Sequence, residues 1–325
     1  MHLEILAANA IDPPSWDAFI EAAPEGGLFS LYAYLEVLRA DWQAAIVKEG
    51  DEWLAVMPFF REKKLGFSRV GQPAFTQYWG PVFAPRFAER SSYKHYSWKR
   101  QVLETMLPAW DEDHLFTMNC SPAFDYPLPF FEAGYELHTR YTYQLDLSLG
   151  QEASWAAMDS SQRRKIRKAN QAAHSIEHRF TAADLLKLYA AQAANGNDIL
   201  GVAPDGSRII TQLIEILPSR LNTYLHAYRQ ADGEIVAAAC FVEFRDHCYY
   251  LFGTYDPKRS QGGEIAALMW DVMQTTPCRI FDFEGSMIPS IARFFRRMGG
   301  SPKAYLQLRK NALPLPIRWI NELRS

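Results

Sequence analysis

Two acidic side chains late in the chain have the residue types and the spacing for proton transfer. In the segment FDFEGS, alternation predicts a strand with Phe281 and Phe283 on one face and Asp282 and Glu284 on the other. Carboxylates between a strand end and a helix start either accept a proton from a substrate amine or satisfy the free amides of the helix. Both roles stay open at this point. Glu284 is the first candidate for catalysis and Asp282 the second.

The residues after this strand predict a sharp turn and a helix. Gly285 permits the turn, Ser286 is expected to cap the helix, and Gly299-Gly300 is expected to end it. Helical spacing predicts a buried stripe made of Ile288, Ile291, Phe295 and Met298. Ser286 would then lie beside the carboxylates, so it is a candidate substrate-binding residue.

A strongly basic segment lies in the middle of the chain. The sequence SSQRRKIRKANQAA, from Ser160 to Ala173, predicts a helix with a serine N-cap, and five of the six residues from Arg163 to Lys168 are basic. The apolar stripe of this helix is expected to contain Ile166, Ala169 and Ala173. Arg163, Arg164 and Arg167 are candidates to hold a phosphate or diphosphate. The alternative is a basic helix face that simply contacts solvent.

A glycine-containing loop, TYDPKRSQGGE, leads from a predicted strand into a predicted helix. Backbone amides in such a loop can surround a phosphate, and Tyr255, Lys258 and Arg259 are its candidate binding residues. A plain connection between strand and helix is the alternative.

An aromatic loop, GQPAFTQYWGP, precedes position 82 and contains the candidates Gln77, Tyr78 and Trp79. Its aromatic rings either stack on a ligand or cover the core of the N-terminal half, and the second interpretation is favoured.

The composition excludes several classes of protein. The 325 residues are 48% hydrophobic and 22% charged, which excludes a disordered or fibrous chain. The net charge of -3 lacks the basic field of a general nucleic-acid binder. No apolar run approaches the roughly 20 residues of a membrane span, and the acidic N-terminal residues do not fit a secretory signal. We therefore expect a cytoplasmic protein.

No metal site and no covalent catalysis are expected. The four cysteines show no CxxC spacing and are interpreted as buried apolar residues, and the eight histidines form no HExxH motif. GxSxG, Walker and GxGxxG motifs are absent as well. Direct transfer between two bound substrates is the simplest expectation.

The order of predicted elements repeats once along the chain. Each half has a hairpin (44–60 and 223–244), a further strand, a helix (93–107 and 262–275), a short strand, a double phenylalanine and a closing strand. We therefore expect an α/β fold with two similar domains, residues 1–150 and 151–325, around a shared cleft. A chance match of common elements is the alternative.

These segments together resemble the Fem-type peptidyltransferase branch of the GNAT acyltransferase superfamily. The resemblance rests on FSLYAYLEVL, WLAVMPFFREKKLGFSRVGQPAFTQYWGPVF, SSQRRKIRKA, FDFEGSMIPSIARFFRRMGG and AYLQLRK, which span nearly the whole chain. It implies two tandem GNAT-like domains, with mixed sheets flanked by helices. It also implies transfer of an acyl or aminoacyl group to an amine, with acyl-CoA or aminoacyl-tRNA as the donor and no metal.

The sequence departs from the family pattern at three places. Fem proteins that use tRNA often carry a long helical-hairpin insertion in the second domain, and this chain has no heptad run for one. The pyrophosphate loop [QR]xxGx[GA] of acetyl-CoA users matches at Arg259 and Gly262 but has Glu264 at the last position. The helix expected after Ser286 has no tyrosine for the general acid that many GNAT enzymes keep there. Neither donor is thereby selected, and the general acid is unassigned.

The leading hypothesis is an acyltransferase that modifies an amine of a cell-wall or surface-polysaccharide precursor, such as a peptidoglycan precursor. Glu284 or Asp282 would accept the amine proton, and backbone amides from Phe252 to Tyr255 would stabilise the oxyanion. The expected partner is a small-molecule or cell-wall-precursor substrate. tRNA is a second partner only if the donor is an aminoacyl-tRNA. The alternative is a non-catalytic binding or scaffolding module with the same fold. The tail from Leu313 to Ser325 is expected to pack on its own domain.

Overall fold

The computed structural model describes residues 1–39, 41–64, 66–85, 92–172, 174–198, 200 and 205–314. The chain divides into two compact units, Met1–Arg140 with Ala304–Ser325 as unit 1, and Tyr141–Lys303 as unit 2. The units divide at Arg140, ten residues before the domain boundary expected from the sequence, and unit 1 also contains residues from the end of the chain. The division into two similar domains, residues 1–150 and 151–325, stays a prediction. The tail expected to pack on its own domain lies outside the described residues beyond Pro314.

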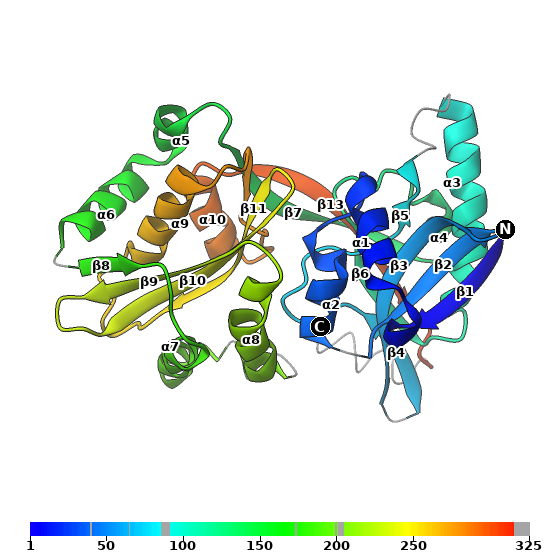
Figure 1. Cartoon of the computed structure of the whole chain (residues 1–325), viewed down its shortest axis with the longest axis horizontal. Coiled ribbons are helices and arrows are strands. Elements are labelled where there is room, and N and C mark those ends of the chain that lie inside the picture. The colour runs from blue at the N-terminus through cyan, green and yellow to red at the C-terminus, as the bar shows by residue number, and fades with distance from the viewer. Residues whose placement is uncertain are drawn as a thin grey trace. The chain divides into compact units, whose positions relative to one another are not determined.

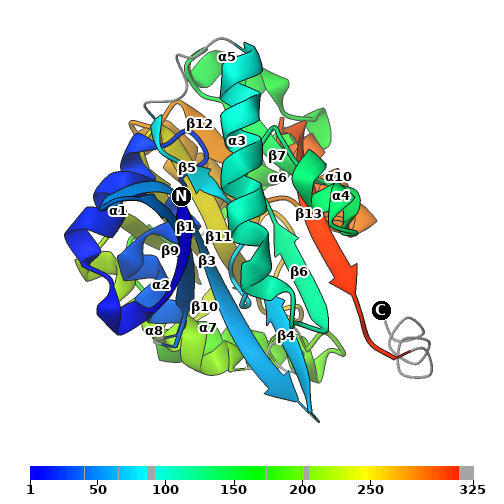
Figure 2. The same cartoon turned by 90° about the vertical axis from the view of Figure 1, so that its right-hand side faces the viewer.

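Unit 1 is built on a mixed sheet in the order β1-β2-β3-β4-β6-β13, with β5 paired to β3. Its strands are β1 (His2–Ala7), β2 (Gln43–Glu49), β3 (Glu52–Lys64), β4 (Phe67–Gly71), β5 (Val82–Phe83), β6 (Leu115–Asn119) and most of β13 (Ser301–Asn311). Its helices are α1 (Pro13–Ala22), α2 (Tyr32–Leu38), α3 (Ser92–Met106) and α4 (Leu128–Glu132). Helix α3 runs along the sheet and contacts β1 and β2 (Figure 2).

In unit 2 the strands pair in the order β7-β12-β11-β10-β9-β8, with both parallel and antiparallel neighbours. Its strands are β7 (Glu136–Asp146, which begins in unit 1), β8 (His174–Glu177), β9 (Thr223–Gln230), β10 (Ile235–Phe244), β11 (His247–Tyr255) and β12 (Ile280–Asp282). Its helices are α5 (Gln151–Ala157), α6 (Ser160–Gln171), α7 (Ala182–Ala194), α8 (Gly206–Glu215), α9 (Glu264–Thr275) and α10 (Pro289–Arg297).

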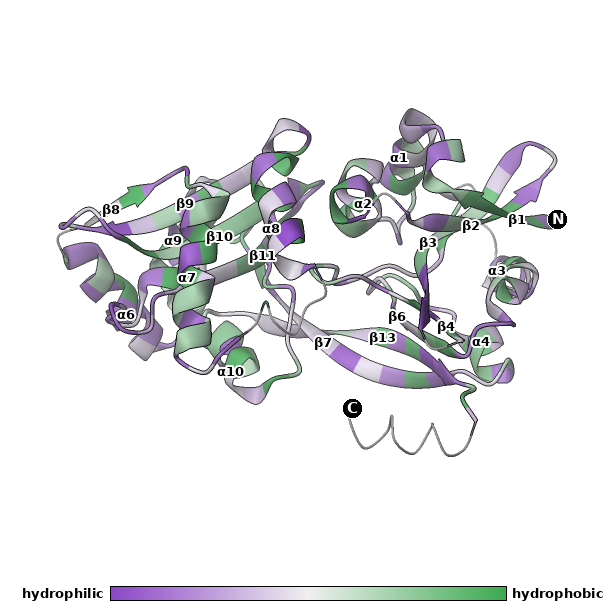
Figure 3. Cartoon of the chain, turned by 90° about the horizontal axis from the view of Figure 1, so that it is seen from below, coloured by the Kyte–Doolittle hydropathy of each residue, from purple (hydrophilic) through white to green (hydrophobic). Residues whose placement is uncertain are grey.

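The helices of unit 2 cover both faces of its sheet (Figure 1). Helices α6, α9 and α10 share one core with the sheet, through Ile166, Leu268 and Phe295 among others, and α7 contacts β10 and β11. Helix α6 is mostly hydrophilic outside its buried stripe, whereas β2 and the centre of β10 are hydrophobic (Figure 3). Because helices cover both faces of this sheet, polar side chains at its strand ends can be buried.

The predicted order of elements is observed in both halves. Hairpin β2-β3 is followed by two strands, β4 and β5, and hairpin β9-β10 by one, β11. In each half a long helix, a short strand, a short helix and a closing strand come next. The four cysteines are free and buried, as expected. Cys240 pairs with Phe252 across β10 and β11, and a bulge between Cys240 and Phe241 shifts the register of this pair of strands.

Two helix starts differ from expectation. Helix α6 is capped by Asp159, whose carboxylate accepts a hydrogen bond from the amide of Ser161 at 2.9 Å, and not by a serine. Helix α10 begins at Pro289, and Ser286 Oγ instead accepts a hydrogen bond from the amide of Ile288. Ile288 and Ile291 are therefore exposed, at 56% and 38%, and only Phe295 and Met298 of the expected stripe are buried.

No helix within the described residues is both long enough and apolar enough to cross a membrane.

Candidate active site

Glu284 is a buried carboxyl group in a strained backbone position. Glu284 lies two residues after the end of β12 and has a φ of +59°. The residue is 9% exposed. The positive φ breaks the strand alternation that the sequence suggested, so that Glu284 lies after the strand rather than within it. Among the described residues its Oε1 atom has no hydrogen-bond partner. A buried carboxylate oxygen with a free lone pair is chemically available to accept a proton.

Gly285 holds this turn against strand β7. Its φ is +68°, and a Cβ atom built on it would lie 2.3 Å from the carbonyl oxygen of Tyr141 and 2.5 Å from the Cα of Thr142. No side chain fits in that space, so the sharp turn expected from the sequence requires glycine for two separate reasons. The close approach of the two backbones fixes the position of Glu284.

Asp282 supports the same turn from inside the sheet. Its Oδ1 accepts hydrogen bonds from Thr142 Oγ1 at 2.7 Å and from the amide of Glu284 at 2.8 Å, and its Oδ2 accepts one from Gln144 Nε2 at 2.8 Å. Both oxygens are thereby engaged. Asp282 accordingly acts as a positioning group for Glu284, which is the more available of the two carboxyl groups.

Burial raises the pKa of both carboxyl groups. The pKa of Glu284 lies well above its usual value because of burial first and the charge of Asp282 second. The pKa of Asp282 is also raised by burial, against the opposing effect of the hydrogen bonds from Gln144, Thr142 and the Glu284 amide. The Glu284 carboxylate therefore binds a proton more tightly than an ordinary carboxylate does, as expected of a general base.

Strands β11 and β12 separate next to Glu284. They pair in parallel only from His247 with Ile280 to Tyr249 with Asp282, although β11 continues to Tyr255. Beyond Tyr249, β11 therefore makes no ladder hydrogen bonds with β12. On its other edge, the same stretch of β11 pairs with β10. This is the stretch whose amides, from Phe252 to Tyr255, the sequence proposes for oxyanion stabilisation.

Tyr250 is a candidate that the sequence did not suggest. Burial raises the pKa of its hydroxyl group, with smaller effects from Tyr189 and Glu284, so the hydroxyl keeps its proton at neutral pH. A protonated hydroxyl beside the candidate base can donate a hydrogen bond or a proton to a leaving group. The sequence did not indicate Tyr250 as a general acid, because Tyr250 lies on β11 and the family pattern has a tyrosine on the helix after Ser286.

The glycine-containing loop before α9 is filled by its own glutamate. The buried Glu264 carboxylate accepts hydrogen bonds from Ser260 Oγ at 2.7 Å, the Gln261 amide at 2.6 Å and the Gly262 amide at 3.1 Å. These are amides that would face a phosphate in an anion-binding loop. The residue that fails the family pattern therefore takes the place of an anion in this loop.

In this loop, the Arg259 side chain and the Lys258 backbone both contact acidic residues of the same chain. Arg259 forms an ion pair with Asp232, and the amide of Lys258 donates to Asp256. The Tyr255 ring is 41% exposed, and its carbonyl accepts a hydrogen bond from Gln192. Their proposed role in phosphate binding stays a prediction.

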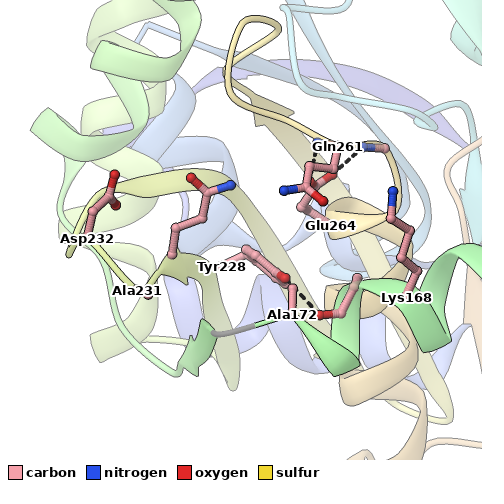
Figure 4. A pocket seen from close by; sticks show the side chains of 10 residues that line it. Lys168, Ala172, Tyr228, Ala231, Asp232, Gln261 and Glu264 are labelled. Carbon is pink, nitrogen blue, oxygen red and sulfur yellow. Dashed lines mark hydrogen bonds between the residues drawn. The ribbon is translucent and has the colours of Figure 1, made fainter.

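A pocket of about 370 Å³ opens beside the same loop in unit 2. It is lined by Lys168, Ala169, Ala172, Tyr228, Gln230, Ala231, Asp232, Gln261, Gly262 and Glu264. Figure 4 shows Lys168 reaching from α6 toward the loop of Gln261 and Glu264, with Tyr228 between the two walls. The Tyr228 hydroxyl donates to the carbonyl of Ala169 at 2.8 Å. The pocket is thus polar and of a size for a small ligand.

Among the described residues, the arginines of α6 that were predicted to bind phosphate form no ion pair with the two candidate carboxylates. Arg164 and Arg167 are exposed, Arg167 lies over the ring of Trp155 at 5.4 Å, and no described ion pair or hydrogen bond links either of them or Arg163 to Glu284 or Asp282. In the described chain the α6 cation that lines the pocket is Lys168. The sequence could have indicated Lys168, because it is the neighbour of Ala169, a residue of the predicted buried stripe.

The aromatic loop residues pack within unit 1. Trp79 is 1% exposed and its Nε1 donates to the carbonyl of Phe29 at 2.7 Å, while Gln77 Nε2 donates to the Tyr305 hydroxyl at 2.9 Å. The ring of Tyr78 meets those of Phe29 and Tyr305 edge to face. These contacts are those of a core, which agrees with the favoured interpretation, and ligand binding by the three residues stays a prediction.

The class of protein follows from the second unit. Residues 159–285 match the family model of an acetyltransferase (GNAT) domain, a segment that contains α6, the Glu264 loop and Glu284. No curated protein matches the chain. The fold is therefore α/β of the GNAT type, with mixed sheets flanked by helices, as the sequence resemblance implied.

Solved structures show the particular arrangement. The chain is similar to FemX, with a TM-score of 0.66, 12% identity and coverage of 98% of this chain and 99% of that one. It is also similar to L-PGS from Bacillus licheniformis, with a TM-score of 0.56, 14% identity and coverage of 96% of both chains. A tandem GNAT protein from the clavulanic acid biosynthesis pathway matches with a TM-score of 0.54, 11% identity and coverage of 96% and 99%. These likenesses show that the chain shares its fold with FemX, L-PGS and a tandem GNAT protein, as the sequence resemblance implied.

Proposed function

We propose that this chain is an N-acyltransferase that moves an activated acyl or aminoacyl group to the amine of a cell-wall or surface-polysaccharide precursor. The observation that carries the proposal is the unpaired, buried carboxylate of Glu284 at the point where β11 and β12 separate. The GNAT domain match across the same residues supports it. The similarity to FemX supports a shared fold. The choice of a cell-wall precursor rests on the sequence resemblance to Fem-type peptidyltransferases, and we propose that the reaction takes place in the cytoplasm.

The proposed reaction is a direct transfer. The amine nitrogen attacks the acyl carbonyl carbon, the new C–N bond forms, and the bond from that carbon to the leaving oxygen or sulfur breaks. Glu284 takes the proton that the nitrogen loses, and amides of β11 from Phe252 onward stabilise the oxyanion. Tyr250 donates a hydrogen bond to the leaving group. Asp282 keeps Glu284 in position throughout, through the bond to its amide.

The donor is proposed to be an aminoacyl-tRNA or another ester rather than an acyl-CoA held at the α9 loop. The Gln261 and Gly262 amides, which would bind a diphosphate there, already bind the Glu264 carboxylate. A diphosphate placed on those amides would also meet the negative charge of Glu264 at contact distance. This is the structural basis for preferring the second of the two donors that the sequence left open.

The filled loop also supports the alternative function, a non-catalytic module that binds a precursor without a donor. The two functions differ in one measurement. Purified protein is incubated with acetyl-CoA or with aminoacyl-tRNA and a nucleotide-linked muramyl pentapeptide that carries a lysine amine, and the mass of the acceptor is followed. A gain in mass equal to one acyl or aminoacyl group indicates an enzyme, and an unchanged acceptor with every donor indicates a module.

We expect Glu284→Gln to lower the rate of this transfer by about 10²–10⁴-fold, since the variant keeps the shape of the side chain but cannot accept a proton. Glu152→Gln, on the exposed side of α5, is the matched control and keeps the wild-type rate. Equal rates for Glu284→Gln and the wild type would refute Glu284 as the base.

A further inference from the structure

Three side chains from distant parts of unit 2 meet at the side of α9. His178 follows β8, His226 lies on β9 and Asp271 lies on α9, about two turns from Glu264. One possible ligand atom from each lies within 4.8 Å of the other two. The residues are more than forty positions apart in sequence, so no short motif reveals them.

The distances within this cluster suit a shared ion. Asp271 Oδ2 lies 3.1 Å from His226 Nδ1 and 3.5 Å from His178 Nε2. Two ligands of one tetrahedral Zn²⁺, with bonds of about 2.0–2.1 Å, are separated by about 3.3 Å. The two imidazole rings are stacked, with centroids 4.5 Å apart. Small rotations of the exposed ring therefore suffice to bring all three atoms around a single ion.

Two of these atoms lack the hydrogen bonds that their burial demands. His226 is 4% exposed, and within the described chain neither its Nδ1 nor Asp271 Oδ2 completes a hydrogen bond. Buried polar atoms of this kind are normally satisfied, and a bound ion that accepts both lone pairs would satisfy them.

The charges and the access of the cluster agree with cation binding. Asp271 supplies a carboxylate oxygen beside the two imidazole rings. The His178 side chain is 69% exposed, which gives an ion a path from solvent and leaves room for a water ligand. Two imidazoles and one carboxylate are ligands that Zn²⁺ and its first-row neighbours prefer over Mg²⁺ or Ca²⁺.

We infer that His178, His226 and Asp271 form a binding site for a divalent transition-metal ion, with Zn²⁺ as the ion to test. The site would join the segment after β8 to β9 and α9, on the opposite half of α9 from the Glu264 loop. It is independent of the proposed acyl transfer, because none of its residues belongs to the candidate active site or to the pocket in Figure 4.

The test uses full-length protein without a histidine tag, stripped with a chelator. Zn²⁺ binding is measured by titration calorimetry, and the thermal midpoint is recorded with Zn²⁺ and with Mg²⁺. We expect one Zn²⁺ per chain and a rise in the midpoint with Zn²⁺ alone. We also expect His178→Ala and Asp271→Asn to weaken Zn²⁺ binding at least about 10-fold, as loss of a ligand requires. His178 is exposed, so its variant is expected to fold.

His138→Ala is the matched control. His138 Nε2 lies 3.1 Å from Glu136 Oε2, a surface histidine–carboxylate pair without a third ligand. This variant keeps the wild-type affinity. Absence of Zn²⁺ binding to the wild type, or equal affinity in the wild type and His178→Ala, would overturn the inference, and either result leaves the transferase assay unaffected.

Discussion

At Glu284, burial and the charge of Asp282 favour the protonated carboxyl group. The native state therefore keeps a proton that the unfolded chain releases near its ordinary pKa of about 4.5. The stability contributed by this proton is fully present below that pH and is lost as the pH rises toward the raised native pKa. A buried carboxyl group whose ionisation destabilises the folded state is expected at a functional site.

Glu284→Gln is accordingly expected to be more stable than the wild type at pH 8, because the amide has no charge to bury. The difference between the thermal midpoints should narrow as the pH is lowered toward 4.5, where both side chains are neutral. Thermal unfolding measured across this range checks the expectation. A wild-type midpoint above that of the variant at pH 8 would mean that the Glu284 carboxylate has a partner in solution.

At the scale of elements, the turn after β12 depends on the approach of two backbones. Gly285→Ala would place a methyl group against Tyr141 and Thr142 and would also adopt an unfavourable φ. We expect a loss of unfolding free energy above the roughly 1–3 kcal/mol of a strained backbone alone. Gly233→Ala isolates the backbone part, since Gly233 has a φ of +88° and nothing within 4 Å of a Cβ. Urea unfolding of both variants gives the comparison, and equal losses would contradict the close approach.

The loop before α9 gives a second prediction at this scale. Glu264→Ala frees the Gln261 and Gly262 amides and restores the small residue that the family pattern has at this position. We expect the variant to bind CoA in calorimetry under conditions where the wild type does not. Glu215→Ala, exposed on α8, is the control and should behave as the wild type. Wild-type protein that binds CoA as tightly as Glu264→Ala would show that the loop is open.

At the scale of the whole molecule, unit 1 has a buried ion cluster of its own. Lys99 on α3 lies 2.6 Å from Asp125 and 3.3 Å from Glu25, and both Lys99 and Glu25 are buried. We expect Lys99→Met to cost about 3–5 kcal/mol of unfolding free energy, because it leaves a buried carboxylate without its cation. Lys94→Met, exposed on the same helix, should cost little.

The loss should be local to unit 1, since the unit 2 core consists of residues from β7 to α10. Amide exchange in Lys99→Met should therefore speed up in α3 and β2 while β10 and α9 keep their protection. Uniform acceleration in both units would mean that they unfold together.

Much of the architecture was predictable because it depends on short-range patterns. Alternation and turn residues predicted the hairpins β2-β3 and β9-β10, and helical spacing predicted the buried Ile166 and Ala169 of α6. The positive φ of Glu284, the bonds that fill the Glu264 loop and the meeting of His178 with Asp271 were not predictable. These features depend on which loop closes on which strand, and no local pattern encodes that.

Strand β13 has a consequence for synthesis on the ribosome. Its residues from Gln307 to Asn311 pair with β6 and complete the sheet of unit 1, yet they are translated after all of unit 2. Domains usually fold in the order in which they emerge. The sheet of unit 1 therefore keeps an open edge at β6 until unit 2 and β13 have been synthesised and have left the exit tunnel. A nascent chain stalled before Ala304 would expose β6 to aggregation or to chaperone binding.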